Sequence, residues 1–166
     1  NATAGLNKER DAAFEVFKKL GFPTSKMEDY KQSDISRAFD AELGLNLRNI
    51  PIPVNPYNAF KCDVPYLNAH VFFLINDRYY DKTQPNSPLP NGVFVGSLQV
   101  FSEKYPRSFN MYYNKIAAVD NGVTAYNTMF AQDGFVVYVP ENTAVEKPIQ
   151  LINILRGGVN LNVNRR

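Results

Sequence analysis

The chain has 166 residues, 45% hydrophobic and 13% aromatic, so it can fold around one core or two small ones and is not of the disordered class. Its net charge of +2 is too small to indicate nucleic acid or an anionic membrane as a partner. The apolar run Val71–Ile75 is far shorter than the roughly 20 residues of a membrane-spanning helix, and the N-terminus has no signal-peptide pattern. A single cysteine, Cys62, excludes an internal disulfide and fits a reducing cytoplasm.

The first predicted element is an amphipathic helix over Lys8–Leu20, capped by Gly21. Its apolar positions fall on one stripe, which we expect to pack on the rest of the chain: Ala13, Phe17 and Leu20. Ser25 followed by Glu28 has the spacing of a capping box and predicts a second, short helix. A third helix, beginning at Ser33 or Asp34, is expected to end at Gly44.

The middle of the chain is predicted to mix extended and helical segments. Prolines alternate with apolar residues over Leu45–Phe60, which predicts an extended segment lying over a surface. Tyr66–Ile75 is predicted as a strand, with a hairpin turn at Asn76-Asp77. Short strand character returns at Val93–Val95. Three helices are then expected, over 97–104, 106–112 and 123–130.

The last third of the chain is predicted to be stranded. Asp133-Gly134 is a turn signal, and Phe135–Val139 is an apolar run typical of a strand buried on both faces. Ile149–Leu155 forms the next such run, and Val159–Asn164 alternates apolar and polar residues like a strand with one buried face. Short strands separated by turns, with no helix between them, favour stacked coils over a βαβ sheet.

The amino-acid sequence of this region is informative in a second way. The segment Asn127–Leu151, NTMFAQDGFVVYVPENTAVEKPIQL, resembles the entry to the β-helix in the SufB/SufD family of iron–sulfur cluster assembly proteins, and SufD more than SufB. Asn91–Leu98 is similar to another segment of that family. A third match lies near the N-terminus, at Arg10, Ala13, Phe17, Gly21-Phe22-Pro23-Thr24, Lys26 and Glu28-Asp29-Tyr30-Lys31. Two departures are Tyr30, where the family usually has Trp, and Gln32-Ser33, where it has Tyr-Thr.

The resemblance implies an α+β fold, with an N-terminal helical region followed by the start of a right-handed parallel β-helix. It divides the chain into a helical region with a proline-rich segment (1–60), a mixed α/β linking region (61–130) and the first β-helix coils (131–166). It also implies a non-catalytic scaffold subunit of the cytoplasmic SUF complex, acting with SufB and with the separate ATPase SufC. Family members are more than twice as long, so the chain is expected to be a fragment that self-associates through an open β-helix end.

No residue is assigned a catalytic, cofactor-binding or metal-binding role. His70, the only histidine, precedes an apolar run and is interpreted as a packed or hydrogen-bonded structural residue; Cys62 is interpreted as an inert thiol. The carboxylates of Asp133, Glu141 and Glu146 lie in or beside predicted turns, where solvation or capping explains them. The fragment is therefore expected to hold no cofactor, although the family's complex handles a nascent iron–sulfur cluster.

Two other classes of function are weighed against the scaffold. A β-helical polysaccharide lyase or hydrolase would line one sheet with paired carboxylates or arginines, and the predicted strands are poor in both. A free-standing protein-binding module could use the proline- and tyrosine-rich surface. The chain's 10 tyrosines could also stack on single-stranded nucleic acid, but half-buried phenols explain them better.

Overall fold

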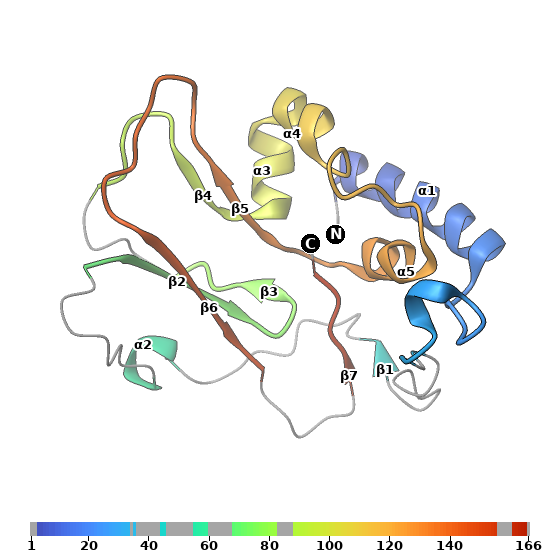
Figure 1. Ribbon diagram of the computed structural model, residues 1–166. Helices are drawn as coiled ribbons and strands as arrows, with labels where there is room; N and C mark the ends of the chain where they lie inside the picture. Colours follow the sequence, from blue (N-terminus) through green and yellow to red (C-terminus); the bar gives the residue numbers. More distant parts are fainter. Residues whose placement is uncertain are drawn as a thin grey trace.

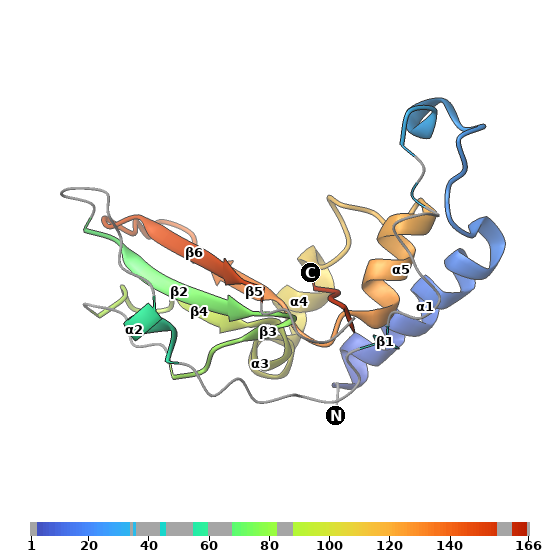
Figure 2. The ribbon, with the colours of Figure 1, turned by 90° about the horizontal axis from the view of Figure 1, so that it is seen from below.

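The computed structural model describes residues 3–33, 35, 44–45, 55–59, 68–82, 88–155 and 161–165 of the chain. These residues form helices and three small sheets, which is an α+β fold. Figure 1 shows most of the helices gathered on the right and the two larger sheets on the left, and the view from below in Figure 2 keeps the same division. No helix among the described residues is long and apolar enough to cross a membrane.

The N-terminal helix α1 spans Ala4–Leu20 and so begins four residues before its predicted start. The hydroxyl of Thr3 accepts a hydrogen bond from the backbone N–H of Leu6 and thereby caps the helix. At the other end, Gly21 takes φ 61° and donates its N–H to the carbonyl of Phe17 at 2.8 Å, as the sequence predicted.

Helix α1 packs against α5 (Gly122–Phe130) through a cluster of aromatic rings. Phe22 lies 5.0 Å from both Phe17 and Tyr126, measured between ring centroids. The predicted stripe is correct at Ala13, which is 1% exposed, and wrong at Leu20, which is 53% exposed. The reason is that the turn after α1 places Phe22, rather than Leu20, against the ring of Tyr126.

Two predicted segments next to this region differ from the structure. The predicted capping box is wrong, because Glu28–Tyr30 forms a single 3-10 turn (η1) whose capping residue, Met27, makes no side-chain capping bond. Pro56–Ala59 is a short helix, α2, where an extended segment was predicted. Proline suits the first position of a helix, and the side chain of Asn55 accepts from the N–H of Tyr57. Cys62, most of the predicted helix up to Gly44 and most of 45–60 lie outside the described residues.

The largest sheet has three strands in the order β3-β2-β6, where β2 is His70–Ile75, β3 is Arg78–Tyr79 and β6 is Ile149–Ile154. Strands β2 and β3 form the predicted hairpin, with Asn76 at φ 54° in the turn. Strands β2 and β6 pair in parallel over their whole length, from His70 opposite Ile149 to Ile75 opposite Ile154. This parallel pairing joins segments more than seventy positions apart in the sequence.

The other two sheets have two strands each. Strands β4 (Phe94–Ser97) and β5 (Phe135–Tyr138) are antiparallel, whereas β1 (Gly44–Leu45) and β7 (Leu161–Asn162) are parallel. Strand β5 was predicted to be buried on both faces, and this is wrong, because Val137 in its two-stranded sheet is 43% exposed. The sheets are small and not closed, so the described residues do not show a parallel β-helix.

Two groups of buried side chains hold these elements together. Leu6, Phe101 and Phe109 belong to a cluster that joins α1 to α3 (Leu98–Lys104) and α4 (Pro106–Tyr112), the two helices predicted before α5. In the sheet, Phe72 and Phe73 are 2% and 1% exposed and point to opposite faces of β2. Phe72 contacts Phe135, and Phe73 contacts Tyr57, so β2 is covered on both sides.

Candidate assembly site

The free edge of β6 is the first feature of interest, because β6 is the outer strand of its sheet among the described residues. On its inner side, the N–H of His70 donates to the carbonyl of Pro148, and the N–H of Asn76 donates to that of Ile154. Backbone groups alternate in direction along a strand, so the N–H groups of Leu151 and Asn153 face the outer edge. An edge of this kind is a template for pairing with another strand.

The strand is half-exposed, and no other described strand pairs with its outer edge. Asn153 is exposed, the remaining residues of β6 are half-buried, and Leu155 just beyond the strand is 65% exposed. Exposed apolar side chains beside a free strand edge are characteristic of surfaces that bind another chain. We call Ile149–Leu155 the β6 edge.

A buried carboxylate lies where β3, β4 and α3 meet. Asp133 is 8% exposed, and one of its oxygens accepts from the Ser97 hydroxyl at 2.8 Å and from the N–H of Gln99 at 3.1 Å. Its other oxygen accepts from the N–H of Tyr79 at 3.4 Å. Three donors satisfy the buried carboxyl oxygens, so Asp133 serves as a junction between β3 and the start of α3.

The segment that follows β7 returns to this junction. Arg165 forms an isolated parallel bridge with Asp133. The side chain of Asn127 on α5 completes the contact, since its amide donates to the carbonyl of Arg165 at 2.8 Å and its oxygen accepts the N–H of Arg165 at 3.1 Å. Asn127 therefore holds the backbone of this segment in the way that a neighbouring strand would.

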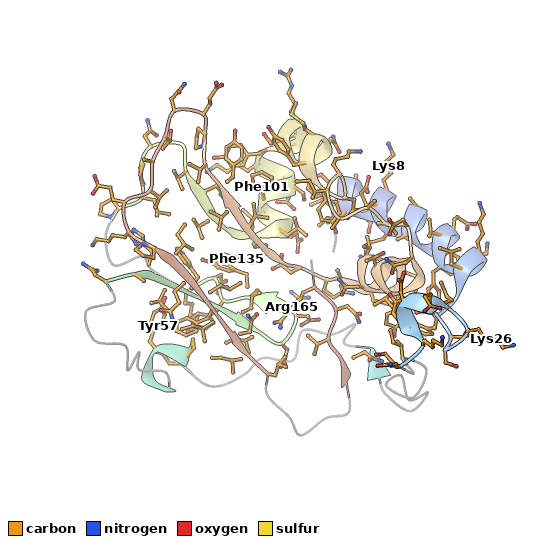
Figure 3. The ribbon with its side chains drawn as sticks, in the orientation of Figure 1. Lys8, Lys26, Tyr57, Phe101, Phe135 and Arg165 are labelled. Atoms are coloured by element: carbon orange, nitrogen blue, oxygen red, sulfur yellow. The ribbon has the colours of Figure 1, made fainter. Side chains whose placement is uncertain are left out.

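The side chain of Arg165 turns toward the β2–β3 hairpin. Figure 3 shows Arg165 near the centre of the molecule, below Phe135. Its guanidinium donates to the carbonyl of Asn76 at 2.8 Å. Burial lowers the pKa of Arg165, whereas the nearby carboxylate of Asp77, itself 3% exposed, acts in the opposite direction. The guanidinium stays charged, and it ties the returning segment to the sheet.

The structure separates the polar residues that the sequence singled out. His70 is 3% exposed at the start of β2, as expected of a packed residue, but its Nδ1 has no hydrogen-bond partner among the described residues. Glu141 and Glu146 are exposed, in agreement with solvation at turns. Asp133 is the exception, since it was interpreted as a turn residue and is a buried acceptor. Cys62 lies outside the described residues.

Sequence reasoning missed the junction because its members are remote from one another in the chain. Ser97 was predicted only to open a helix, which it does by accepting the N–H of Val100, and Arg165 was assigned no role. The sequence offered little signal, because Asn127 and Asp133 lie beside other polar residues, Thr128 and Gln132. No cluster of three or more His, Cys, Asp or Glu side chains that could hold a metal occurs in the described part of the chain.

These features define an α+β module whose polar residues hold segments together and whose largest sheet has an open edge among the described residues. A family model described as the SufBD protein N-terminal region matches residues 1–151, and the chain belongs to this family. Membership associates the chain with iron–sulfur cluster assembly by the SUF system, in a family whose members are generally non-catalytic. No curated protein matches the chain.

Proposed function

We propose that the chain is part of a non-catalytic scaffold subunit of the SUF complex, nearer to SufD than to SufB, and that it acts in the cytoplasm with SufB and SufC. The family match supports the SUF system, and the three sequence segments described above support the SufD branch. The observation that carries the scaffold role is the β6 edge: a half-exposed, apolar strand with outward-facing N–H groups suits pairing with a second subunit.

The path of the last part of the chain supports the start of a parallel β-helix as the finer description of the fold. The chain leaves Asp133, passes through β5, β6 and β7, and comes back to Asp133 at Arg165 in the parallel direction. A chain that returns parallel to its own beginning, with no helix among the described residues in between, follows the path of one coil. Strand β6 would then be the position on which a further strand is added.

A pair of substitutions at Asn153 tests the role of the β6 edge. Asn153→Pro removes an N–H that faces outward and spares the inner hydrogen bonds to β2, whereas Asn153→Ala keeps that N–H. Co-expressed with SufB, the native chain and Asn153→Ala should retain SufB on a tagged column, and Asn153→Pro should lose most of it. Equal retention of SufB by all three chains, with unchanged melting temperatures, would contradict pairing through this edge.

The edge also leads us to propose that the chain self-associates when SufB is absent. Light scattering on a size-exclusion column should give a dimer or larger species at micromolar concentration, and Asn153→Pro should shift it to a monomer. SufC is expected to bind the family's C-terminal region, so a pull-down with SufC should give no retention beyond that of the empty resin. Clear retention of SufC would place part of its binding surface in this chain.

We propose further that the chain itself holds no iron–sulfur cluster. Cys62 and His70 are its only cysteine and histidine, and such clusters are held mainly by several convergent thiolates. After reconstitution with iron and sulfide and removal of unbound ions, the iron content should be far below one per chain. Stoichiometric iron that survives Cys62→Ala would contradict this and would indicate a set of ligands other than thiolate.

A further inference from the structure

The dipeptide Asn-Gly occurs at two places in the chain, Asn91-Gly92 and Asn121-Gly122, and valine follows it at both. This dipeptide is chemically labile, because glycine has no Cβ to shield its backbone nitrogen from the side chain that precedes it. The two sites share the same three residues, so a difference in their reactivity has to come mainly from the fold. Figure 1 shows them apart, one before β4 and the other at the start of α5.

The first site lies in an exposed turn. Asn91 and Gly92 are both exposed, and the N–H of Val93 donates to the carbonyl of Pro90 at 3.1 Å across them. Gly92 takes φ 83°, the left-handed conformation that suits glycine as the third residue of a turn. Among the described residues, no hydrogen bond holds the side chain of Asn91. The side chain is therefore free to turn toward the nitrogen of Gly92.

The second site is the capped start of a helix. The side-chain oxygen of Asn121 accepts from the N–H of Val123 at 3.1 Å and from that of Thr124 at 3.0 Å. Its side-chain nitrogen donates to the carboxylate of Asp120 at 3.1 Å. Gly122 is buried, whereas Gly92 is exposed. The side chain of Asn121 can therefore reach the nitrogen of Gly122 only after the first turn of α5 opens.

We propose that Asn91 is a site of spontaneous deamidation, and that the start of α5 protects Asn121 from the same reaction. The nitrogen of Gly92 bonds to the side-chain carbonyl carbon of Asn91, and its proton leaves with the side-chain amide as ammonia. One water molecule then opens the resulting five-membered succinimide at either of its carbonyl groups. The products are aspartate and isoaspartate, and the reaction needs no oxidant, reductant or cofactor.

Deamidation would alter the entry to β4. Aspartate adds a negative charge to the turn, whereas isoaspartate also lengthens the backbone by one methylene group. The turn has little room for this change, because a Cβ built at Gly92 would lie 3.0 Å from the ring of Pro140. Two residues further on, Phe94 pairs with Tyr138 at the beginning of the β4–β5 sheet. We therefore expect isoaspartate at position 91 to loosen this pairing and to lower the melting temperature.

Peptide mapping by mass spectrometry tests the proposal on the folded chain after incubation at mildly alkaline pH. Asn91 should be converted about tenfold faster than Asn121, because the reaction at Asn121 requires loss of the helix cap. An isoaspartate-specific carboxyl methyltransferase should label the peptide that contains residue 91. In guanidinium chloride the two sites should react at similar rates, because the unfolded chain no longer distinguishes them.

Asn91→Gln is the control, because its longer side chain would have to form a less favourable six-membered ring. This variant should keep its melting temperature during the incubation, while that of the native chain falls. Equal rates at the two sites in the folded chain would overturn the proposal. Conversion of both sites in guanidinium chloride but of neither in the folded chain would also overturn it, by showing that the turn protects Asn91. An unchanged melting temperature after conversion of Asn91 would overturn the effect on β4.

Discussion

The helical end and the sheet end of the molecule differ in how completely they are closed. At the helical end, α1 and α5 cover each other's apolar faces, and Phe17, Phe22 and Tyr126 pack together. At the sheet end, β2 is covered on both faces, but β6 beside it keeps an open edge among the described residues. The helical end is thus closed by its own contacts, whereas the edge of β6 is the feature on which the proposed scaffold role rests.

The junction at Asp133 connects these two ends. It receives hydrogen bonds from β3 and from the start of α3, and Arg165 and Asn127 link the same place to the hairpin and to α5. These polar contacts add to the apolar packing between the two ends, in which Phe135 contacts Phe72 of β2 and Tyr138 contacts Phe101 of α3. Four substitutions, taken from the largest expected effect to the smallest, test this comparison.

Truncating a buried side chain of the central strand, β2, should have the largest effect on the free energy of unfolding. Phe73 is 1% exposed and packs on Tyr57, so Phe73→Ala should lower the free energy of unfolding by about 3–5 kcal/mol. Phe14→Ala on the exposed face of α1, at a residue that is 46% exposed, is the control and should cost well under half as much. Urea unfolding measures both free energies. Equal losses would mean that the buried ring of Phe73 contributes no more to stability than an exposed ring.

Loss of the junction should come next. Asp133→Ala leaves the donors of Ser97, Gln99 and Tyr79 without their acceptor, and we expect a loss of about 2–3 kcal/mol. The same substitution should speed hydrogen exchange of the amides of Tyr79 and Gln99 more than that of Phe17 in α1. Glu141→Ala, at an exposed carboxylate, should leave unfolding and exchange unchanged. Native protection of Tyr79 and Gln99 in Asp133→Ala would show that the two ends are joined by other contacts.

The close approach of α1 and α5 gives a prediction for the helical end. Gly122 is buried, and a Cβ built there would collide with the carbonyl oxygen of Gly21, a backbone atom that cannot rotate away. Gly122→Ala should therefore cost about 1–3 kcal/mol, despite the better helix propensity of alanine. Gly5→Ala meets only the side chain of Phe109 and should cost less. If Gly122→Ala melts at the native temperature or above, the packing of the two helices is looser than described.

The smallest effect concerns alkaline pH. Burial raises the pKa of Tyr126, so between its unfolded and folded pKa values the unfolded chain has lost a proton that the folded chain keeps. The contribution of Tyr126 is therefore fully present below its ordinary pKa of about 10 and is lost as the pH rises above it. Thermal melts of Tyr126→Phe should fall less steeply than native melts from pH 9 to about 11. Parallel curves would show that the ring is solvated at the helical end.

The sequence by itself determined the local features of the chain. The helix over 106–112 and the start at Ser97 follow from proline and a capping hydroxyl, and Gly21 ended α1 where predicted. Helix α5 begins at Gly122, one residue before its predicted start, because the side chain of Asn121 accepts the N–H groups of Val123 and Thr124. The hairpin at Asn76-Asp77 was likewise predicted from the sequence. All of these depend on hydrogen bonds within one turn of chain, so the residues that cause each feature are adjacent in the sequence.

Only the tertiary structure decided which strands pair and what the polar residues do. The parallel register of β2 with β6, the burial of Asp133 and the choice of Phe22 over Leu20 against α5 all depend on segments remote in sequence. Strand patterns specify an apolar face but not a neighbour, because any strand with a matching face could form the same backbone hydrogen bonds. The pairing that forms is the one that buries the most apolar side chains and leaves the fewest buried polar groups without a hydrogen bond. That choice depends on the whole chain at once.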